Sequence, residues 1–301
     1  MSHPTDASLL GPDLAESEFR EVNGIRMHVV AAGPVDGPLL VLLHGFPEFW
    51  YGWHHQIRPL VEAGFRVLVP DQRGYNLSER PPAVADYRIS LLAGDIRELI
   101  ASEGRESACV VGHDWGAMVA WYLACAHPQC VNALVVCNVP HPSAFRKLAP
   151  RRWRQIKKSW YALFFQLPWL PEWMLEAGHF RSFRAVLAKD ARPGSFTETD
   201  LWRYRSAWQR SGGVGGMVNW YRSAVRHRET PQQSRVAAPT LILWGVHDSY
   251  LIAELAEASL EYCEQGRLVW FDEASHWLHH EFPDEVTQHI IEHCKKDKSK
   301  V

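Results

Sequence analysis

The stretch Val110-Val111-Gly112-His113-Asp114-Trp115-Gly116 decides the fold, because it has the frame of a tight strand-to-helix turn with an aspartate at its apex. The apolar residues before it, Ala108 to Val111, predict a strand, and Ala117 to Ala124 after it predict a buried helix. Glycines two residues before and two residues after Asp114 match the G-x-S-x-G frame of a nucleophile elbow. Glycine at these places lets neighbouring backbone pass closely while the apex residue holds a strained conformation.

An aspartate at the apex indicates a different chemistry from that of serine. An ionised carboxylate needs no base before it attacks, and it can displace a leaving group at a saturated carbon to form an alkyl ester. A histidine is then free to activate water against that ester. Epoxides and alkyl halides are the substrates that suit this sequence of steps. The alternative interpretation is that Asp114 is only the N-cap of the following helix.

Length and composition are typical of one globular enzyme, with 301 residues of which 47% are hydrophobic and 22% charged. Residues Met1 to Glu16 lack the basic start and apolar stretch of a signal peptide. No apolar stretch reaches the length of a membrane span, so we expect no membrane partner. The cysteines show no paired spacing, which predicts reduced thiols and a cytoplasmic protein. They are Cys109, Cys125, Cys130, Cys137, Cys263 and Cys294.

Strand and helix patterns alternate along most of the chain. The Asn23-Gly24 pair between two strand-like runs predicts an opening hairpin. Strands are expected at residues 18–22, 25–31, 39–43, 66–69, 108–111, 133–137, 240–244 and 267–271, and helices near 53–61 and at 91–102, 117–124, 253–262 and 284–293. This alternation predicts an α/β protein with a mostly parallel, doubly wound sheet.

Strand patterning disappears between residues 140 and 231, where aromatic-rich helical segments contain seven of the fourteen tryptophans. We therefore expect a helical cap at 140–231 inserted into a core formed by residues 1–139 and 232–301. The inserted segment carries 17 Lys/Arg against 6 Asp/Glu, which raises nucleic-acid binding as an option. Its charges alternate with apolar residues at helical spacing and no nucleic-acid motif is visible, so we expect no nucleic-acid partner.

Four motifs in this order resemble those of the α/β-hydrolase fold epoxide hydrolases, the soluble epoxide hydrolase-like proteins. They are His44-Gly45-Phe46-Pro47-Glu48, Asp71-Gln72-Arg73-Gly74-Tyr75, Gly112-His113-Asp114-Trp115-Gly116 and Ala274-Ser275-His276-Trp277, and the resemblance covers about residues 18–295. It implies an α/β-hydrolase fold with an inserted helical cap, a small-molecule epoxide and water as substrates, a vicinal diol as product, and no cofactor. The oligomeric state stays open between a monomer and a homodimer.

The resemblance places three catalytic side chains in the chain order nucleophile, acid, histidine. Asp114 is the nucleophile, Asp248 in Trp244-Gly245-Val246-His247-Asp248 orients the base, and His276 is the base that activates water. The alternative for Asp248 is a carboxylate that caps a turn or helix. His279 and His280 compete with His276, but only His276 directly follows the last strand in the expected way.

Two backbone amides are expected to stabilise the oxyanion that forms when water attacks the Asp114 ester. One belongs to Trp115, at the start of the helix after the nucleophile, and the other to Phe46 in the loop after the strand at 39–43. Glu48 has two interpretations, positioning of water or hydrogen bonding within its loop. Loop-organising roles are expected for Asp71 and Arg73.

Opening an epoxide produces an alkoxide, which a pair of tyrosine hydroxyls in an apolar pocket can bind and protonate. Tyr161 and Tyr221 lie in segments similar to the two cap tyrosine segments of the family. The alternative is that both pack as amphipathic residues. The glycine-rich run at 212–216 lacks a following Lys-Ser/Thr, so it is not expected to bind phosphate.

Three other functions are alternatives to this hypothesis. A haloalkane dehalogenase is the nearest alternative, but Phe46 stands where an asparagine would donate to the halide. Fluoroacetate-type relatives carry arginines where this chain has Trp115 and Met118. A non-catalytic ligand-binding homologue usually lacks one member of the catalytic set. The run His276-x-x-His279-His280-Glu281 lacks a third ligand at metal-site spacing, so no metal site is expected.

Overall fold

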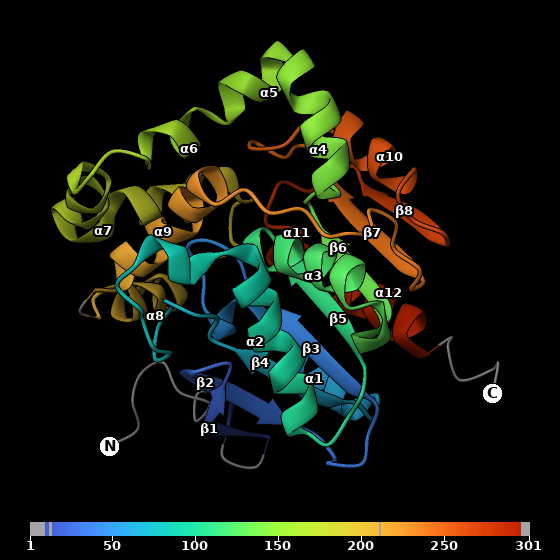
Figure 1. Ribbon diagram of the computed structural model, residues 1–301. Helices are drawn as coiled ribbons and strands as arrows, with labels where there is room; N and C mark the ends of the chain where they lie inside the picture. Colours follow the sequence, from blue (N-terminus) through green and yellow to red (C-terminus); the bar gives the residue numbers. More distant parts are fainter. Residues whose placement is uncertain (1–9, 12–13, 211, 296–301) are drawn as a thin grey trace.

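A single eight-stranded sheet crosses the molecule in the computed structural model, which describes residues 10–11, 14–210 and 212–295 (Figure 1). We expect no signal peptide in the N-terminal segment Met1 to Glu16. Most of this segment, namely residues 1–9 and 12–13, lies outside the described residues. The strands are β1 (Ala15–Val22), β2 (Ile25–Ala32), β3 (Leu39–Leu43), β4 (Arg66–Pro70), β5 (Ala108–His113), β6 (Val131–Cys137), β7 (Thr240–Gly245) and β8 (Gly266–Phe271).

The strand order is β1-β2-β4-β3-β5-β6-β7-β8, with β5 in the interior of the sheet. The β1–β2 and β2–β4 pairs are antiparallel, and the five other pairs are parallel. All residues of β3, β5 and β7 are buried, which explains why these strands appear in the sequence as continuous apolar runs. The predicted mostly parallel α/β fold is confirmed.

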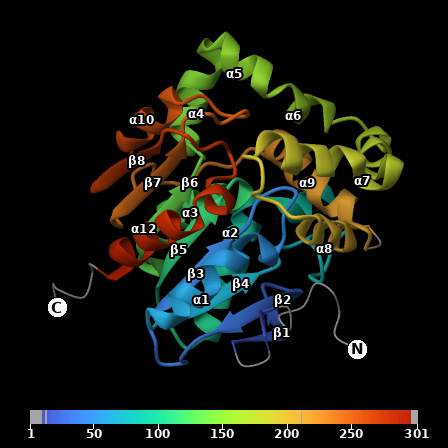
Figure 2. The same ribbon diagram turned by 180° about the vertical axis from the view of Figure 1, so that it is seen from behind.

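Helices cover both faces of the sheet. On one face α2 (Ile89–Ser102) contacts α3 (Trp115–Ala126), and on the other α1 (His54–Glu62) contacts α12 (Pro283–Lys295), as Figures 1 and 2 show. The remaining core helices are α10 (Glu254–Leu260) and α11 (Leu278–Glu281), with short 3-10 turns η2 (Trp50–Trp53), η3 (Val84–Tyr87) and η4 (Pro128–Cys130). A further 3-10 turn, η5 (Ala149–Arg151), lies between β6 and β7. No helix within the described residues is both long enough and apolar enough to cross a bilayer.

Between β6 and β7 the described chain is helical, as predicted. We call this stretch the helical insertion; it comprises α4 (Pro142–Leu148), α5 (Trp153–Lys158), α6 (Trp160–Phe164), α7 (Leu170–Asp190), α8 (Glu198–Trp208) and α9 (Gly213–Arg226). In both views α5 to α9 lie across one end of the sheet. A capping box formed by Thr197 and Asp200 starts α8, and the hydroxyl of Tyr51 donates to Asp200. The insertion is thereby joined to the core at η2.

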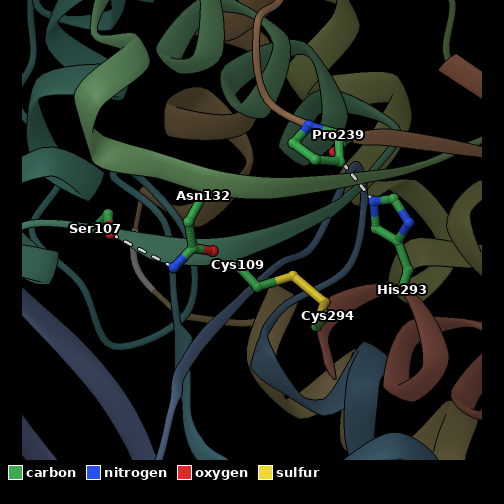
Figure 3. Close-up of a disulfide and its surroundings, with 6 residues drawn as sticks. All are labelled: Ser107, Cys109, Asn132, Pro239, His293 and Cys294. Carbon is green, nitrogen blue, oxygen red and sulfur yellow. Dashed lines mark hydrogen bonds between the residues drawn. A yellow bond between two sulfur atoms is a disulfide. The ribbon is translucent and has the colours of Figure 1, made fainter. Parts of the chain in front are cut away.

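The prediction of reduced cysteines is wrong for one pair. Cys109 at the start of β5 forms a disulfide with Cys294 near the end of α12, with Cα atoms 6.0 Å apart (Figure 3). The two residues are 185 positions apart, so sequence spacing gave no sign of the pairing. The helix end is also held by a hydrogen bond of 3.0 Å between His293 and the carbonyl of Pro239. Cys125, Cys130, Cys137 and Cys263 are free and buried.

Candidate active site

Asp114 occupies the turn between β5 and α3 with φ 49° and ψ −123°. A non-glycine residue rarely adopts this backbone conformation, and such strain is typical of functional turns. The turn is possible because glycines surround it. A Cβ at Gly116 would lie 2.2 Å from the carbonyl oxygen of Leu43, and a Cβ at Gly45 would lie 2.3 Å from Cβ of Asp114. The sequence motif therefore forms the elbow geometry that was predicted from it.

His276 lies between the two predicted carboxylates. Its Nε2 is 3.6 Å from Oδ2 of Asp114, and its Nδ1 is 2.7 Å from Oδ2 of Asp248. Asp248 is fixed in turn, because its Oδ1 accepts hydrogen bonds from the backbone amides of Tyr250 and Leu251. The loops after β5, β7 and β8 thus bring together three side chains that are 134 and 28 residues apart in the sequence.

The electrostatics of this trio favour an ion pair. Burial opposes charge on His276, but Asp248 and Asp114 outweigh it and raise the pKa of the imidazole to about 10. Burial also opposes charge on Asp114, yet the contact with His276 is strong enough to lower the pKa of the carboxyl. Asp114 is therefore ionised at neutral pH, as a carboxylate nucleophile must be.

The predicted backbone donors lie on either side of Asp114. The amide of Phe46 donates to Oδ1 of Asp114 over 2.8 Å. Trp115 is the first residue of α3, so its N–H has no acceptor within the helix. The negative carboxylate also sits at the positive end of the α3 dipole. Both features suit an oxygen atom that gains negative charge.

Tyr161 on α6 and Tyr221 on α9 come from the helical insertion to the same place. Their rings are 5.8 Å apart, and the ring of Tyr221 lies 4.9 Å from that of Trp115 and 5.2 Å from that of Phe46. Burial, and then the negative charge of Asp114, raise the pKa of both phenols. Both hydroxyls are therefore protonated and able to donate a hydrogen bond near the carboxylate.

Aromatic side chains form the wall around these polar groups. The ring of Phe46 contacts those of Phe165 and Phe183, with centroids 5.7 and 5.3 Å apart. The rings of Trp115 and Trp220 also pack together, with centroids 5.9 Å apart. The surface hollow of about 350 Å³ beside Trp270 contains none of the predicted site residues, so we assign it no part in the site. The surroundings of Asp114 suit an apolar small molecule.

Glu48 is the centre of a buried network that sequence reasoning did not resolve. Its Oε1 accepts from the hydroxyl of Tyr204 and from Nε2 of His280, each over 2.7 Å, and its Oε2 is 3.2 Å from Nδ1 of His113. Nε2 of His113 is 2.9 Å from the carbonyl of His276. Of the two interpretations of Glu48, hydrogen bonding is the one that the geometry supports.

Asn138 is a second structural residue that the sequence pattern did not indicate. It follows β6 with φ 54°, and its side chain donates to the carbonyl of Ser275 over 2.7 Å and accepts from the amide of Gly245 over 2.6 Å. It thereby ties the loops of Asp248 and His276 to one another. A polar residue directly after a buried strand was the only available signal.

The two residues expected to organise loops do so. Asp71 accepts from the backbone amide of Trp50 and contacts Nδ1 of His28 at 2.6 Å. Arg73 forms a buried ion pair with Asp95 at 2.6 Å. Among the described residues, neither side chain forms a hydrogen bond or an ion pair with Asp114, Asp248 or His276.

Two groups of side chains in the described residues have a geometry that could hold a metal ion. One is Glu48, His113 and His279, and the other is His54, His55 and His280. In the first group Oε2 of Glu48 already contacts Nδ1 of His113 at 3.2 Å and Nε2 of His279 at 3.3 Å. The second group combines histidines from opposite ends of the sequence, which is why the local run at 276–281 did not reveal it.

Comparison with known proteins gives consistent results. The family described as alpha/beta hydrolase fold matches residues 38–283. The chain is 44% identical to AB hydrolase superfamily protein YfhM of Bacillus subtilis over 94% of this chain and 99% of that protein. It is 37% identical to Epoxide hydrolase 1 of Caenorhabditis elegans, over 93% of this chain and 70% of that protein.

Solved structures agree with the sequence relatives. The crystal structure of Bacillus megaterium epoxide hydrolase in complex with an inhibitor superimposes with a TM-score of 0.84 at 31% identity, covering 91% of this chain and 98% of that one. Epoxide Hydrolase A from Mycobacterium thermoresistibile gives 0.79 at 30% identity, covering 94% and 98%.

Proposed function

The chain belongs to the α/β-hydrolase family and to the epoxide hydrolases within it, and we propose that it converts epoxides to vicinal diols through an ester on Asp114. The observation that carries this proposal is the elbow itself. An ionised aspartate stands where its fold places a nucleophile, 3.6 Å from a histidine that a second aspartate orients.

In the first step, a carboxylate oxygen of Asp114 attacks an epoxide carbon, and the bond from that carbon to the epoxide oxygen breaks. Tyr161 and Tyr221 bind the oxygen, and one phenol gives it a proton. The proximity of both phenols to Asp114, and the effect of its charge on their pKa values, support this assignment. The product is an alkyl ester with a neighbouring hydroxyl.

In the second step, water attacks the ester carbonyl and loses one proton to Nε2 of His276. The N–H groups of Phe46 and Trp115 stabilise the oxyanion. The intermediate collapses by expelling the alcohol oxygen, which takes the proton from His276. The remaining water proton passes from the new carboxyl to His276 and restores the imidazolium. Asp114 is regenerated and a diol is released, so the sum is addition of one water molecule.

Esterification makes His276 a base at the moment when a base is needed. With Asp114 ionised, two carboxylates hold the imidazole in its charged form and raise its pKa to about 10. The ester removes one of those charges, so the pKa falls and the imidazolium gives its proton to the phenolate left by the first step. The neutral imidazole can then accept a proton from water. The same pair of carboxylates therefore supports both steps.

A trapping experiment tests the proposal. His276→Gln should form the ester without hydrolysing it, so we would incubate this variant with styrene oxide, then separately with a bromoalkane, and locate adducts by peptide mass spectrometry. An epoxide-derived adduct on Asp114 is expected, with Asp114→Ala as the unlabelled control. An adduct from the bromoalkane alone would indicate a dehalogenase. No adduct on a folded protein, together with ligand-induced melting shifts, would indicate a binding protein.

We further propose that residues 140–231 act as a cap domain over a core made of residues 1–139 and 232–301. The contribution of Tyr161 and Tyr221 from α6 and α9 to the surroundings of Asp114 supports this division. We also propose a cytoplasmic location, which four buried free thiols support. The Cys109–Cys294 disulfide counts against this location, because disulfides are rare in that compartment. A pair that is mainly oxidised in cells whose thiols are blocked at lysis would overturn it.

A further inference from the structure

Three histidines meet at the surface of the core, outside the proposed catalytic groups. His54 and His55 open α1, and His280 lies on α11 near the other end of the sequence. One nitrogen atom of each ring lies within 4.8 Å of a nitrogen of each of the other two. We propose that His54, His55 and His280 bind a divalent transition-metal ion of the Zn²⁺ class.

Hydrogen bonds leave one ring nitrogen of His54 and one of His280 free to bind a metal ion. Nδ1 of His54 is 2.7 Å from the carbonyl oxygen of Tyr51, so the proton lies on Nδ1 and Nε2 keeps its lone pair. Nε2 of His280 is 2.7 Å from Oε1 of Glu48, which leaves the lone pair on Nδ1. A histidine that donates its other N–H to a carbonyl or carboxylate is the usual arrangement behind a metal ligand.

The free nitrogen of His280 is the second observation that points to a ligand. The side chain of His280 is fully buried, and its Nδ1 has no hydrogen-bond partner. A buried acceptor without a partner costs free energy, which a bound ion would offset. The ring of His54 is fixed as well, because it stacks on Tyr51 with centroids 4.0 Å apart and planes 3° apart.

Access and charge also suit a cation. His55 is exposed and His54 is half-buried, so an ion can enter from solvent and reach His280. Asp200 acts electrostatically on both His54 and His55, and Asp284 acts on His55, which places negative charge around a dication. Three imidazoles leave the fourth tetrahedral position to water.

The ion would lie outside the proposed catalytic groups, and a chain of hydrogen-bonded side chains would connect it to them. Glu48 joins His280 to His113, and His113 contacts the main chain of His276. We therefore expect the ion to stabilise the junction of α1 and α11 and not to touch substrate. This role does not depend on the reaction proposed above.

Calorimetric titration of Zn²⁺ into chelator-treated protein tests the site, with Co²⁺ absorption to report the coordination geometry. We expect one ion per chain and the visible bands of tetrahedral Co²⁺. His55→Gln should weaken Zn²⁺ binding by more than about tenfold, because the loss of a ligand costs at least as much as the loss of an outer-shell partner. His179→Gln, which removes an exposed histidine on α7, should leave the affinity unchanged.

Two results would overturn the metal site. One is wild-type protein that takes up no Zn²⁺ at micromolar concentration. The other is equal Zn²⁺ affinity in wild type, His55→Gln and His54→Gln, with all three folded by circular dichroism, because the ion would then bind elsewhere.

A different observation concerns the outside of the helical insertion. Large apolar side chains are exposed along α5, α6 and α7, including Trp160 (65%), Leu163 (73%) and Trp169 (73%). We call them the outer patch, which consists of Trp153, Ile156, Trp160, Leu163, Trp169 and Trp173. Figures 1 and 2 both place α5 and α6 at the outer rim of the molecule. Exposed apolar patches of this kind mark interaction surfaces.

The charge around the outer patch identifies its partner. Residues 142–176 contain seven Lys/Arg, all within 146–158, and two Asp/Glu; Glu172 is paired with Arg222, and Lys147 with Glu261. The ammonium group of Lys157 lies 4.7 Å from the ring of Trp153. Tryptophan and isoleucine interleaved with basic residues, as at 151–160, are typical of helices that lie on anionic lipid. We infer that the outer patch binds the surface of a membrane containing anionic lipids.

The expectation of no membrane partner was based on the absence of a spanning stretch, and a helix lying on the surface needs none. α6 links this surface to the site, because Trp160 and Leu163 are exposed while Tyr161, between them, contacts Tyr221. On the proposed function, an apolar epoxide dissolved in the lipid would enter on this side.

Vesicle co-sedimentation tests the membrane contact. We expect binding to vesicles of phosphatidylcholine with 30% phosphatidylglycerol (a composition chosen at about one charge in three lipids) and much weaker binding to phosphatidylcholine alone. Trp160→Ser/Leu163→Ser should reduce binding several-fold, and Val35→Ser, which changes an exposed apolar residue elsewhere, should not. Equal sedimentation of the two variants, or a wild-type dimer that the double variant converts to a monomer, would overturn it.

Discussion

At the scale of the residue, the charge of His276 depends on which neighbours are ionised. Oδ2 of Asp248 is 2.7 Å from Nδ1 of His276, and Oδ2 of Asp114 is 3.6 Å from its Nε2. The imidazole is therefore buried between two anions. Burial alone would make it a weak base, and the two carboxylates reverse this effect. Removing the charge of one carboxylate therefore tests directly how the two anions keep His276 protonated.

Asp114→Asn should lower the pKa of His276 from about 10. The reason is that Asp248 alone must then oppose the effect of burial. Histidine-selective ¹⁵N NMR titration measures the change, and an unaltered pKa would contradict it. Because the wild-type pKa lies above the ordinary value, the stabilisation from charged His276 is full below about pH 6.5 and is lost as pH rises toward 10. This loss should be smaller in Asp114→Asn.

Tyr161→Phe and Tyr221→Phe should each slow formation of the ester by about 10²–10⁴-fold and affect its hydrolysis less. Both phenols act on the epoxide oxygen, which has left the reacting carbon before water attacks. Rapid-quench kinetics separates the two steps. If both substitutions slowed hydrolysis more than ester formation, the hydroxyls would have to be assigned to the water instead.

At the scale of the element, local sequence was sufficient where one strand and one turn carry the signal. The elbow, the opening hairpin and the buried runs of β3, β5 and β7 are of this kind. The network around Glu48 was not predictable, because Tyr204 and His280 are 156 and 232 residues away from it. Pairings at such distances depend on how helices pack and leave no periodic pattern in the sequence.

The close packing of the elbow gives a prediction for two glycines. Gly116→Ala would place a Cβ 2.2 Å from the carbonyl oxygen of Leu43, so β3 or α3 must shift. We expect a loss of about 2–4 kcal/mol in the free energy of unfolding, together with loss of activity. Gly215→Ala, in α9 with nothing within 4 Å of the new Cβ, should be neutral or gain about 0.5–1 kcal/mol. Urea unfolding that ranks the two variants in the opposite order would contradict the packing.

At the scale of the whole molecule, the Cys109–Cys294 disulfide joins the strand that carries Asp114 to the last helix and closes a loop of 185 residues. Cross-linking residues so far apart restricts the unfolded chain, so Cys294→Ser should lose about 2–5 kcal/mol of unfolding free energy. Dithiothreitol should destabilise the wild type by a similar amount and leave Cys294→Ser unchanged. Thiol titration of the unreduced, unfolded wild type should find four free thiols, matching Cys125, Cys130, Cys137 and Cys263. Six titrating thiols, and a wild type insensitive to reductant, would show that the chain folds without this bond and restore the expectation drawn from cysteine spacing.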